Sequence, residues 1–333
     1  MTPLRIGVLG AARIAPAALL KPAAAVDGVE VVAVAARSRD RAAKLAGRFG
    51  VPKALGSYAE LLADPEIGAV YIPLPNGLHA EWTLRALAAG KHVLCEKPLT
   101  ANEAEAQRVA DAAGPSGRVV MEAFHYRYHP LAARIDQILH GERRIGAITH
   151  VETWMCFPLP RFSDIRYQYD LAGGATMDAG CYALHAARFA GPGEPEVTGA
   201  RATLLRRGGG TSIDRAMSVD LRFPGGATGA AHTSMWSRTL LRIGLKVTGE
   251  RGELSVPWFV MPKFATLRLT VDGRTTKEKV PGDSTYTHQL RAFRDAVGGA
   301  DTNLTPPADS VLTMRLIDAA YRAAGLPLRG AGG

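Results

Sequence analysis

An acidic and a basic residue stand together at the end of a short apolar stretch. In VLCEKPL, Glu96 and Lys97 directly follow the apolar residues 93–95, and Pro98 comes next. Neighbouring side chains on extended backbone point to opposite faces, so the two charges are expected to serve different partners. If the apolar stretch is a parallel strand, its carboxyl end is where such a sheet binds its ligand. Lys97 could then donate a proton or lower a neighbour's pKa; the alternative is an exposed ion pair of small energy.

A second group of ionisable side chains lies in GGATMDAGCYALH. Asp178, Tyr182 and His185 follow one another at helical spacing and would share one face of a helix. The neighbouring face is apolar and can pack, with Met177, Cys181 and Leu184. Such a polar stripe faces either a site or solvent. A tyrosine beside a lysine can act as an acid–base pair, because the ammonium favours the phenolate.

The first apolar stretch ends in a turn of small residues. VLGAARIA contains Gly10-x-Ala12-x-x-Ala15, a degenerate form of GxGxxG with two glycines replaced by alanine. Small residues allow a tight turn there and let the backbone approach a pyrophosphate at a helix N-terminus. The alternative is an ordinary strand–helix turn. The residues predicted to bind a cofactor here are Gly10, Ala12, Arg13 and Ile14.

The second apolar stretch is followed by basic residues. It ends at Ala36, and Arg37 and Ser38 come next. A site for NAD usually carries an acid at this point, whereas an arginine and a hydroxyl can hold a 2′-phosphate. These residues therefore favour NADP(H) as the cofactor, with NAD(H) as a second option. The alternative is that they only form the solvated start of a helix.

A further turn, PLPNGLHAEW, follows the apolar residues 69–72. Its prolines and glycine fix an extended turn on the expected cofactor side of the sheet. The residues predicted to approach the cofactor are Leu74, Pro75, Asn76 and His79, although His79 could equally be a residue that only begins a helix.

The elements that must position these residues follow two patterns. Apolar stretches predict strands at 5–10, 29–36, 69–75, 92–95 and 118–124. Helical patterns separate them: one follows the first strand and reaches Ala25, and others lie at 40–50, 79–89 and 100–113. Such alternation predicts a parallel sheet with helices on both faces. From about residue 145, longer β-type stretches follow at 147–157, 218–236, 241–256 and 265–273, with turns at 224–226 and 249–252.

The predicted fold is therefore an α/β Rossmann domain over residues 1–125 and an α+β domain over residues 126–330. The second domain is expected to have a large, mostly antiparallel open-faced sheet, and its C-terminal helices are expected to return toward the Rossmann domain. Helical patterns lie at 173–190, 284–298 and 308–325. Residues 206–210 are expected to form a loop and the tail GLPLRGAGG to fray.

Composition narrows the class of protein. The chain has 333 residues, is 47% hydrophobic and carries a formal charge of +9. Its basic residues are scattered among acids without a nucleic-acid-binding motif, so we expect no nucleic-acid partner. No apolar run approaches the ~20 residues that span a bilayer, and a strand begins within the first ten residues, so neither a membrane span nor a leader is expected. Three cysteines without zinc-type spacing predict reduced thiols, no metal site and a cytoplasmic protein.

These motifs together resemble the Gfo/Idh/MocA oxidoreductase family, most closely its branch of dimeric dihydrodiol dehydrogenases and NADP-dependent D-xylose dehydrogenases. The resemblance rests on GVLGAARIA, residues 73–99, MEAFHYRYHP and residues 173–185. It implies a second-domain sheet that covers the nicotinamide, carries the substrate pocket and pairs with another subunit in a homodimer or homotetramer. It also implies a cis bond between Lys97 and Pro98.

The resemblance also implies roles for individual residues. Lys97 matches the lysine beside the nicotinamide, Tyr182 the acid–base position, and Asp178 the acid that orients substrate and base. Arg166 and Tyr286 match cofactor contacts, and Glu96 is left to the cofactor side or to bracing its loop.

The implied function is an NADP-dependent oxidoreductase that transfers a hydride between nicotinamide and a secondary alcohol or carbonyl of a small sugar, polyol or cyclic diol. Whether Tyr182 or Lys97 transfers the proton stays open. So do two alternatives: an enzyme that keeps NADP bound and passes hydride between two sugars, and a nucleotide-binding regulator without turnover. The side chains expected around the substrate are Arg127, Trp154, Phe157, Arg161 and Tyr167, although core packing would explain the aromatic residues among them equally well.

Overall fold

The protein consists of two compact units, which a computed structural model describes for residues 2–206 and 212–330. The first unit combines Met1–Tyr128 with Asp283–Val311, and the second combines His129–Gly282 with Leu312–Gly333. The first division lies close to residue 125, where the sequence predicted it. The segment 283–311 belongs to the first unit, whereas the sequence prediction assigned it to the second domain. Most of the predicted loop at 206–210 lies outside the described residues.

The first unit is built on a six-stranded parallel sheet with the order β3-β2-β1-β4-β5-β6. Its strands are β1 (Leu4–Leu9), β2 (Val29–Ala35), β3 (Lys53–Leu55), β4 (Ala69–Ile72), β5 (His92–Cys95) and β6 (Val120–Glu122). Its helices are a π-helical turn η1 (Pro16–Leu20), α1 (Lys21–Ala23), α2 (Arg39–Phe49), α3 (Tyr58–Ala63), α4 (His79–Ala88), α5 (Glu103–Ser116) and α8 (Thr285–Val297). This is the predicted Rossmann arrangement.

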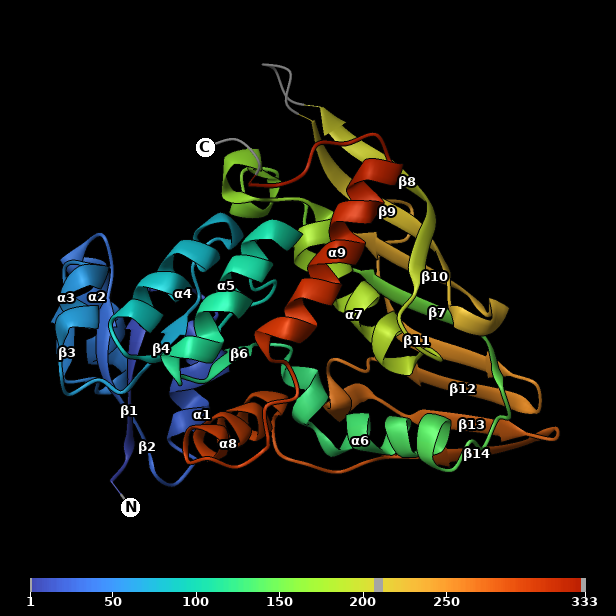
Figure 1. Ribbon diagram of the computed structural model, residues 1–333, viewed down its shortest axis with the longest axis horizontal. Coiled ribbons are helices and arrows are strands. Elements are labelled where there is room, and N and C mark those ends of the chain that lie inside the picture. Colours follow the sequence, from blue (N-terminus) through green and yellow to red (C-terminus); the bar gives the residue numbers. More distant parts are fainter. Residues whose placement is uncertain (1, 207–211, 331–333) are drawn as a thin grey trace. The chain divides into compact units, whose positions relative to one another are not determined.

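Helices pack on both faces of this sheet because its central strands are apolar on both sides. On one face, Val8, Tyr71 and Leu94 share a buried cluster with Phe293 of α8. On the other face, Val70 and Val93 pack in a second buried cluster. Figure 1 shows α8 beside α1, so a helix from the far end of the chain completes the first face of the sheet.

Two elements of the first unit were not predicted. β3 and α3 lie in the segment 53–63, which the sequence analysis left without structure. The three residues of β3 are only half-buried, so this edge strand has no apolar run to reveal it. The predicted strand 69–75 ends at Ile72, immediately before Pro73, because proline cannot donate to a strand ladder.

The second unit is built on an eight-stranded sheet with the order β14-β13-β12-β11-β7-β10-β9-β8. All neighbouring pairs are antiparallel except β7 and β10, which run parallel. The strands are β7 (Ile148–Cys156), β8 (Glu196–Arg206), β9 (Ser212–Arg222), β10 (Thr228–Ser234), β11 (Arg242–Gly249), β12 (Gly252–Pro257), β13 (Leu267–Val271) and β14 (Arg274–Glu278). The main helical segments are α6 (Pro130–Asp136), η4 (Gln137–Gly141), η7 (Thr176–Gly180) and α7 (Cys181–Ala190), with α9 (Pro307–Ala323) shared between the units. The prediction of a mostly antiparallel sheet is confirmed.

The two faces of this sheet have different environments. Figure 1 shows α7 lying against β7 and β10. Thr153 donates from Oγ1 to the carbonyl of Ala183 in α7, and Thr233 donates to the carbonyl of Ala175, which precedes η7. Since side chains alternate along a strand, Trp154 and His232 lie on the opposite face, called the outer face below.

The C-terminal segment does not fray as predicted, at least through Gly330. The side chain of Arg329 is 0% exposed. The hydroxyl of Tyr169 donates to the carbonyl of Leu328 at 2.8 Å. Residues 331–333 of the predicted tail lie outside the described part of the chain.

Candidate functional site

The turn after β1 requires a glycine at its first position. Gly10 has φ +119°, and a Cβ there would lie 3.0 Å from Cδ2 of Leu74. The other two fingerprint positions carry alanines, of which Ala12 is half-buried and Ala15 is completely buried in the core. The tight turn that lets backbone approach a pyrophosphate is therefore present with one glycine. Arg13 and Ile14, also predicted to bind cofactor, are exposed in this turn.

A basic cluster lies where β2 meets α2. Ser38 is the N-cap of α2, and its Oγ accepts a hydrogen bond from the backbone N–H of Arg41 at 3.4 Å. The guanidinium of Arg41 donates to the carbonyl of Ala11, in the turn after β1, at 3.4 Å. Burial raises the pKa of Tyr58, and the positive charges of Arg37 and Arg41 oppose this increase. These groups are of the kind that can hold a 2′-phosphate, since two guanidinium cations act on Tyr58 and the Ser38 hydroxyl lies beside Arg41.

Sequence reasoning named Arg37 and Ser38 but missed Arg41. The available signal was its spacing: a residue three positions after an N-cap serine lies in the first turn of the helix, beside the cap.

His79 holds two loops of the first unit together. Its ring is 0% exposed, with Nδ1 2.7 Å from the carbonyl oxygen of Pro98 and Nε2 2.7 Å from that of Leu74. Carbonyl oxygens only accept, so the ring satisfies both only as the imidazolium. Burial nevertheless lowers the pKa of His79, and the charge of Lys97 acts in the same direction. Both ring nitrogens are used inside the unit, so His79 positions the two loops, and its predicted contact with the cofactor stays a prediction.

The remaining predicted residues of this turn lie close to His79 in sequence. Asn76 begins the short 3₁₀ helix η2 (Asn76–Leu78), and Pro75 precedes it. Leu74 is 9% exposed and packs against the core, where it also meets the turn at Gly10.

Glu96 and Lys97 directly follow the end of β5. Glu96 accepts a hydrogen bond at 2.7 Å from the hydroxyl of Tyr71 in β4. The peptide bond between Lys97 and Pro98 is cis, as the resemblance implied. The next residue, Leu99, donates its backbone N–H to the buried carboxylate of Glu122 at 2.9 Å. The backbone around Lys97 is therefore held from both sides.

Two aromatic residues complete this end of the first unit. The rings of His125 and Tyr286 have centroids 4.2 Å apart. Burial, and secondly the charge of Lys97, lower the pKa of His125 to about 3. Burial, and secondly Glu96, raise the pKa of Tyr286. Tyr286 was predicted as a cofactor contact, whereas His125 was missed although it lies in the MEAFHYRYHP motif.

Asp178 and Arg166 are paired in the second unit. Arg166 Nε lies 2.8 Å from Oδ2 of Asp178, and its Nη1 lies 3.1 Å from Oδ1 of Asp164. Asp178, and to a smaller extent Asp164, raise the pKa of Arg166. Arg166 is therefore the cationic partner of Asp178, and its predicted contact with the cofactor stays a prediction.

The polar stripe on η7 and α7 is enclosed. Tyr182 is 8% and His185 3% exposed, and the Asp178 side chain is 12% exposed, so the solvent-facing alternative is wrong. The neighbouring residues pack as predicted and are at most 1% exposed: Met177, Cys181 and Leu184. Asp178 lies in the π-helical segment η7 and Tyr182 in α7. Three predicted site residues of the second unit, Arg166, Asp178 and Tyr182, thus belong to one buried segment and its partner loop.

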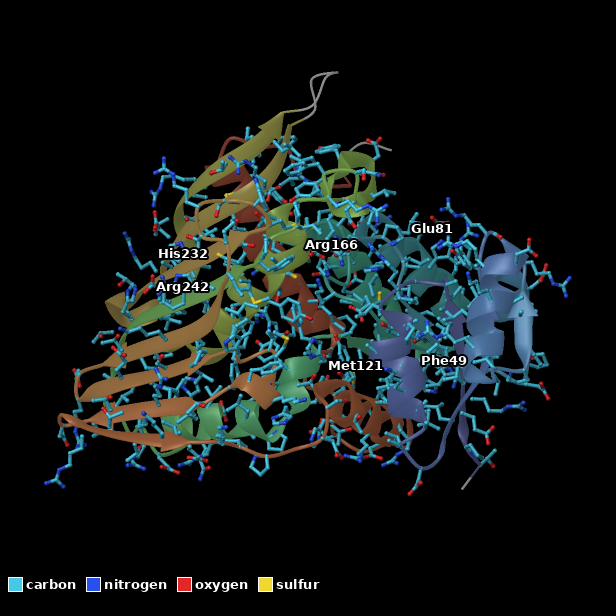
Figure 2. All side chains as sticks on the ribbon, turned by 180° about the vertical axis from the view of Figure 1, so that it is seen from behind. Phe49, Glu81, Met121, Arg166, His232 and Arg242 are labelled. Atoms are coloured by element: carbon cyan, nitrogen blue, oxygen red, sulfur yellow. The ribbon has the colours of Figure 1, made fainter. Side chains whose placement is uncertain are left out.

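Two aromatic residues expected around the substrate are engaged elsewhere. Tyr167 is 0% exposed and donates its hydroxyl to the Leu159 carbonyl at 2.9 Å, and burial raises its pKa to about 12. Trp154 belongs to the outer face of the sheet, where the guanidinium of Arg242 covers its ring at 3.6 Å. Figure 2 shows Arg242 beside His232 on this sheet.

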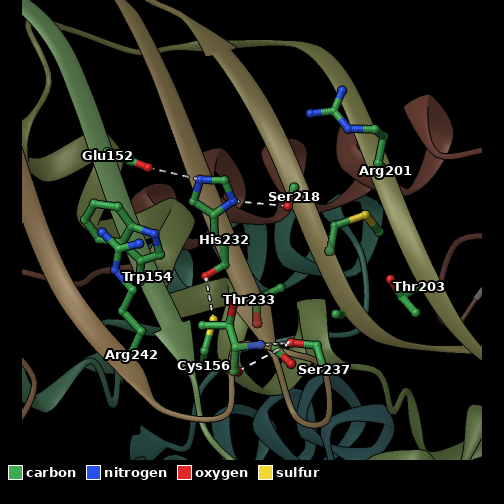
Figure 3. A pocket seen from close by; sticks show the side chains of 14 residues that line it. Glu152, Trp154, Cys156, Arg201, Thr203, Ser218, His232, Thr233, Ser237 and Arg242 are labelled. Atoms are coloured by element: carbon green, nitrogen blue, oxygen red, sulfur yellow. Dashed lines mark hydrogen bonds and ion pairs between the residues drawn. The ribbon is translucent and has the colours of Figure 1, made fainter.

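The outer face carries a polar depression of about 420 Å³. His232 lies at its centre, 3.3 Å from the carboxylate of Glu152 and 3.1 Å from the hydroxyl of Ser218 (Figure 3). The ring of His232 also stacks near Trp154, with centroids 6.0 Å apart. This group is separate from the η7–α7 segment, because it lies on the opposite face of the sheet.

Within residues 2–206 and 212–330, no group of three or more histidine, cysteine, aspartate or glutamate residues could hold a metal ion. Within the same ranges, no helix combines the length and the apolar character that crossing a bilayer requires.

Comparison with known families matches both halves of the chain. Residues 4–124 match the oxidoreductase family with an NAD-binding Rossmann fold, known as GFO_IDH_MocA. Residues 134–255 match the GFO/IDH/MocA C-terminal domain.

Individual relatives agree with this assignment. The chain is 39% identical over 323 residues to D-xylose 1-dehydrogenase (NADP(+)) 2 of Haloferax volcanii, covering 96% of this chain and 97% of that protein. It is 32% identical over 256 residues to trans-1,2-dihydrobenzene-1,2-diol dehydrogenase of Xenopus laevis, covering 76% and 73% of the two chains. Its fold resembles that of KijD10, a 3-ketoreductase from Actinomadura kijaniata in complex with NADP and TDP-benzene, with a TM-score of 0.87, 31% identity and coverage of 97% and 98%.

These matches confirm the predicted enzyme class and branch, and they support the preference for NADP. They agree with the single-glycine turn at Gly10 and with the basic cluster at Arg37 and Arg41. The chain therefore belongs to the Gfo/Idh/MocA family of oxidoreductases.

Proposed function

We propose that this protein is an NADP-dependent dehydrogenase that oxidises a secondary alcohol of a small sugar, polyol or cyclic diol and reduces the corresponding carbonyl. The observation that carries this proposal is the basic cluster of Arg37, Ser38 and Arg41, which fits a 2′-phosphate. The relatives named for D-xylose and for a dihydrobenzenediol support the substrate class. When bound, NADP⁺ supplies the acceptor for the substrate's hydride.

The first unit is proposed to hold the cofactor and to supply a cation. The turn at Gly10 would receive the pyrophosphate, and the basic cluster the 2′-phosphate. Lys97, whose loop is held by His79 and Glu122, would present its ammonium to the reacting hydroxyl. A cation there favours the alkoxide that forms as the hydroxyl loses its proton.

The second unit is proposed to supply the acid–base group. As the phenolate, which the ammonium of Lys97 would favour, Tyr182 would accept the hydroxyl proton during oxidation, and as the phenol it would return that proton during reduction. Asp178, held by Arg166, would bind a neighbouring substrate hydroxyl through its carboxylate. That Lys97 and Tyr182 serve the same hydroxyl follows from the family resemblance of their two motifs.

The test is turnover of the variants Lys97→Met and Tyr182→Phe with NADP⁺ over a panel of aldoses, inositols and cyclic diols. Positioned proton transfer contributes about 10²–10⁴-fold, so each variant is expected to lose at least about 100-fold in kcat while still binding NADPH. Tyr128→Phe is the control, because it removes a buried hydroxyl that binds Thr305 in the same unit as Lys97. Near-normal turnover in both variants would contradict the mechanism.

The sugar–sugar alternative makes a different prediction. An enzyme that passes hydride between two sugars without releasing its cofactor retains NADP through gel filtration. The dehydrogenase proposed here loses NADP on the column and regains activity when NADP⁺ is added.

We further propose that the outer face of the second-unit sheet pairs with a second copy of the chain. Two observations support this: the face carries charges of both signs, including Glu152, Arg242 and Lys246, and Leu240 and Leu241 at its margin are 54% and 57% exposed. A self-complementary patch is what a two-fold dimer needs. The corresponding experiment is argued at the end of the Discussion.

We also propose that the enzyme acts in the cytoplasm. Cys95, Cys156 and Cys181 are all buried free thiols, which suits a reducing compartment. Recovery of the native enzyme in an exported or membrane fraction would contradict this proposal.

A further inference from the structure

The C-terminal segment after α9 contains an arginine that is completely enclosed. Arg329 is 0% exposed and is the largest of the fully buried side chains in the described part of the chain. Its Nε donates to the carbonyl of Gly173 at 2.7 Å. Its two terminal nitrogens donate to Oδ1 of Asp214 at 2.8 Å and to the carbonyl of Pro327 at 2.9 Å. Each guanidinium nitrogen therefore has its own partner inside the second unit.

Aromatic rings hold the same segment. The guanidinium of Arg329 lies 4.3 Å from the ring centroid of Tyr321 and 4.8 Å from that of Tyr169. The hydroxyl of Tyr169 donates to the carbonyl of Leu328 at 2.8 Å. Cation–π contacts strengthen when the cation is desolvated, as it is here. The segment that contains Leu328 and Arg329 is thus part of the core.

Asp214 connects this arginine to the segment that carries Asp178. Oδ2 of Asp214 accepts from both the backbone N–H and the hydroxyl of Thr176, each at 2.7 Å. Its Oδ1 also accepts from the hydroxyl of Tyr321 at 3.1 Å. Thr176 is the first residue of η7. The N–H groups at the start of a helical segment have no partner within that segment, and the Asp214 carboxylate supplies an acceptor there. Asp178 follows two residues later in the same segment.

Two glycines make the close contact possible. A Cβ on Gly174 would lie 2.2 Å from Oδ1 of Asp214, and one on Gly173 would lie 2.7 Å from the carbonyl oxygen of Arg166. Gly174 donates its N–H to that same carbonyl at 2.8 Å. The side chain of Arg166 in turn binds Asp178 at 2.8 Å. A continuous series of contacts therefore leads from the C-terminal arginine to the carboxylate proposed to bind substrate.

We propose that Arg329 is a positioning residue of the active site: by binding Gly173 and Asp214 it fixes the turn at residues 173–176 and thereby places Asp178 and Tyr182. The inference rests on the proposed function, because it takes Asp178 and Tyr182 as the groups that serve the substrate. Without Arg329, the buried Asp214 carboxylate loses its cation and the Gly173 carbonyl loses its donor, so the turn is no longer held in one position.

Two truncations that differ by one residue test the proposal. A chain ending at Arg329 keeps the arginine that binds Gly173 and Asp214, and a chain ending at Leu328 lacks it. The longer chain is expected to retain the kcat of the full chain. The shorter chain is expected to lose at least about tenfold in kcat, since small misplacements of reacting groups are costly, while its NADPH dissociation constant changes less than twofold. A folded shorter chain whose kcat matches that of the longer chain overturns the proposal.

A conservative variant decides the question if the shorter chain fails to fold. Arg329→Lys keeps a buried cation near Asp214 but cannot bind Asp214, Gly173 and Pro327 together in one plane. Its kcat is expected to fall about three- to tenfold with an unchanged NADPH dissociation constant. An unchanged kcat, or equal losses in kcat and NADPH affinity, overturns the positioning role.

Hydrogen exchange separates this inference from the proposed function. Backbone amides of residues 173–182 are expected to exchange faster in the chain ending at Leu328 than in the chain ending at Arg329, while those of β1 in the first unit do not change. This readout needs no turnover. A full chain that oxidises no alcohol refutes the proposed function, whereas unchanged exchange at 173–182 refutes the role of Arg329 alone.

Discussion

At the scale of single residues, the cofactor preference is proposed to depend on charge at the end of β2. Arg37 and Ser38 were predicted from the sequence, and the structure adds Arg41, which reaches the turn after β1 through the Ala11 carbonyl. A guanidinium that contacts both the turn and the proposed 2′-phosphate position couples the two halves of a dinucleotide site. Such coupling is specific for NADP(H), because NAD(H) has no phosphate at that position.

Replacement of Arg41 by alanine is expected to change the preference between the two cofactors. A hydrogen bond to a charged group contributes about 1.5–3 kcal/mol, so Arg41→Ala should weaken NADPH binding about tenfold or more while leaving NADH binding within twofold. Fluorescence titration with each nucleotide measures both values. Arg48→Ala, at the other end of α2, is the matched control and should change neither. An equal loss for both nucleotides would show that Arg41 does not read the phosphate.

Other residue-scale features could not be predicted. The sequence motifs located His79 and Arg166, but their partners within the chain were not predicted. The structure shows His79 between two backbone carbonyls and Arg166 on Asp178. Spacing along a chain indicates which element a side chain belongs to, but not which partner from a distant segment meets it. Arg329 is the extreme case, since its partner Asp214 is 115 residues away.

At the scale of elements, hydrophobic periodicity was sufficient for strands with a full apolar run. β1, β2, β4 and β5 were predicted because both their faces are buried. β3 was missed because a three-residue edge strand carries no such run. The η7 segment was predicted as ordinary helix, and its π-helical turn was not foreseen. Burial of the described part of the C-terminal segment could not be predicted, because GLPLRGAGG has the composition of a fraying tail and the partners of Arg329, among them Gly173 and Asp214, lie far away in the sequence.

The turn after β1 gives a prediction about an element rather than a side chain. Alanine at a left-handed position costs about 1–2 kcal/mol, so Gly10→Ala and Gly50→Ala should both lower the free energy of unfolding. Only Gly10→Ala also brings a Cβ to 3.0 Å from Leu74, at the turn proposed to receive the pyrophosphate; nothing lies within 4 Å of a Cβ at Gly50. Gly10→Ala is therefore expected to weaken NADPH binding by about tenfold, the equivalent of about 1.4 kcal/mol. Gly50 caps the C-terminus of α2, and the Gly50→Ala variant should bind NADPH normally. Equal NADPH affinities in the two variants would contradict a role for the turn after β1.

At the scale of the whole molecule, the outer face of the second-unit sheet is the part whose purpose a single chain does not explain. Trp154 is covered by Arg242, and His232 lies between Glu152 and Ser218, so the face is structured rather than merely solvated. The chain carries a formal charge of +9, but its scattered basic residues form no nucleic-acid-binding motif, so no nucleic-acid partner was predicted for any of its surfaces. The mixed charges of this face agree with contact between like chains, because each copy offers the other both signs.

Disruption of the margin of this face tests the pairing. Leu240 and Leu241 precede β11, beside residues that line the outer-face depression, and are 54% and 57% exposed. The wild-type chain of 35.3 kDa is expected to sediment as a dimer or tetramer at micromolar concentration. The double variant Leu240→Asp with Leu241→Asp should sediment as a smaller species, because desolvating two carboxylates in an interface is unfavourable. Leu304→Asp, a similarly exposed leucine of the first unit, is the control and should keep the wild-type size. A wild-type monomer, or a double variant of unchanged size, would show that this face does not pair; retained NADPH binding in the double variant would show that its first unit is intact.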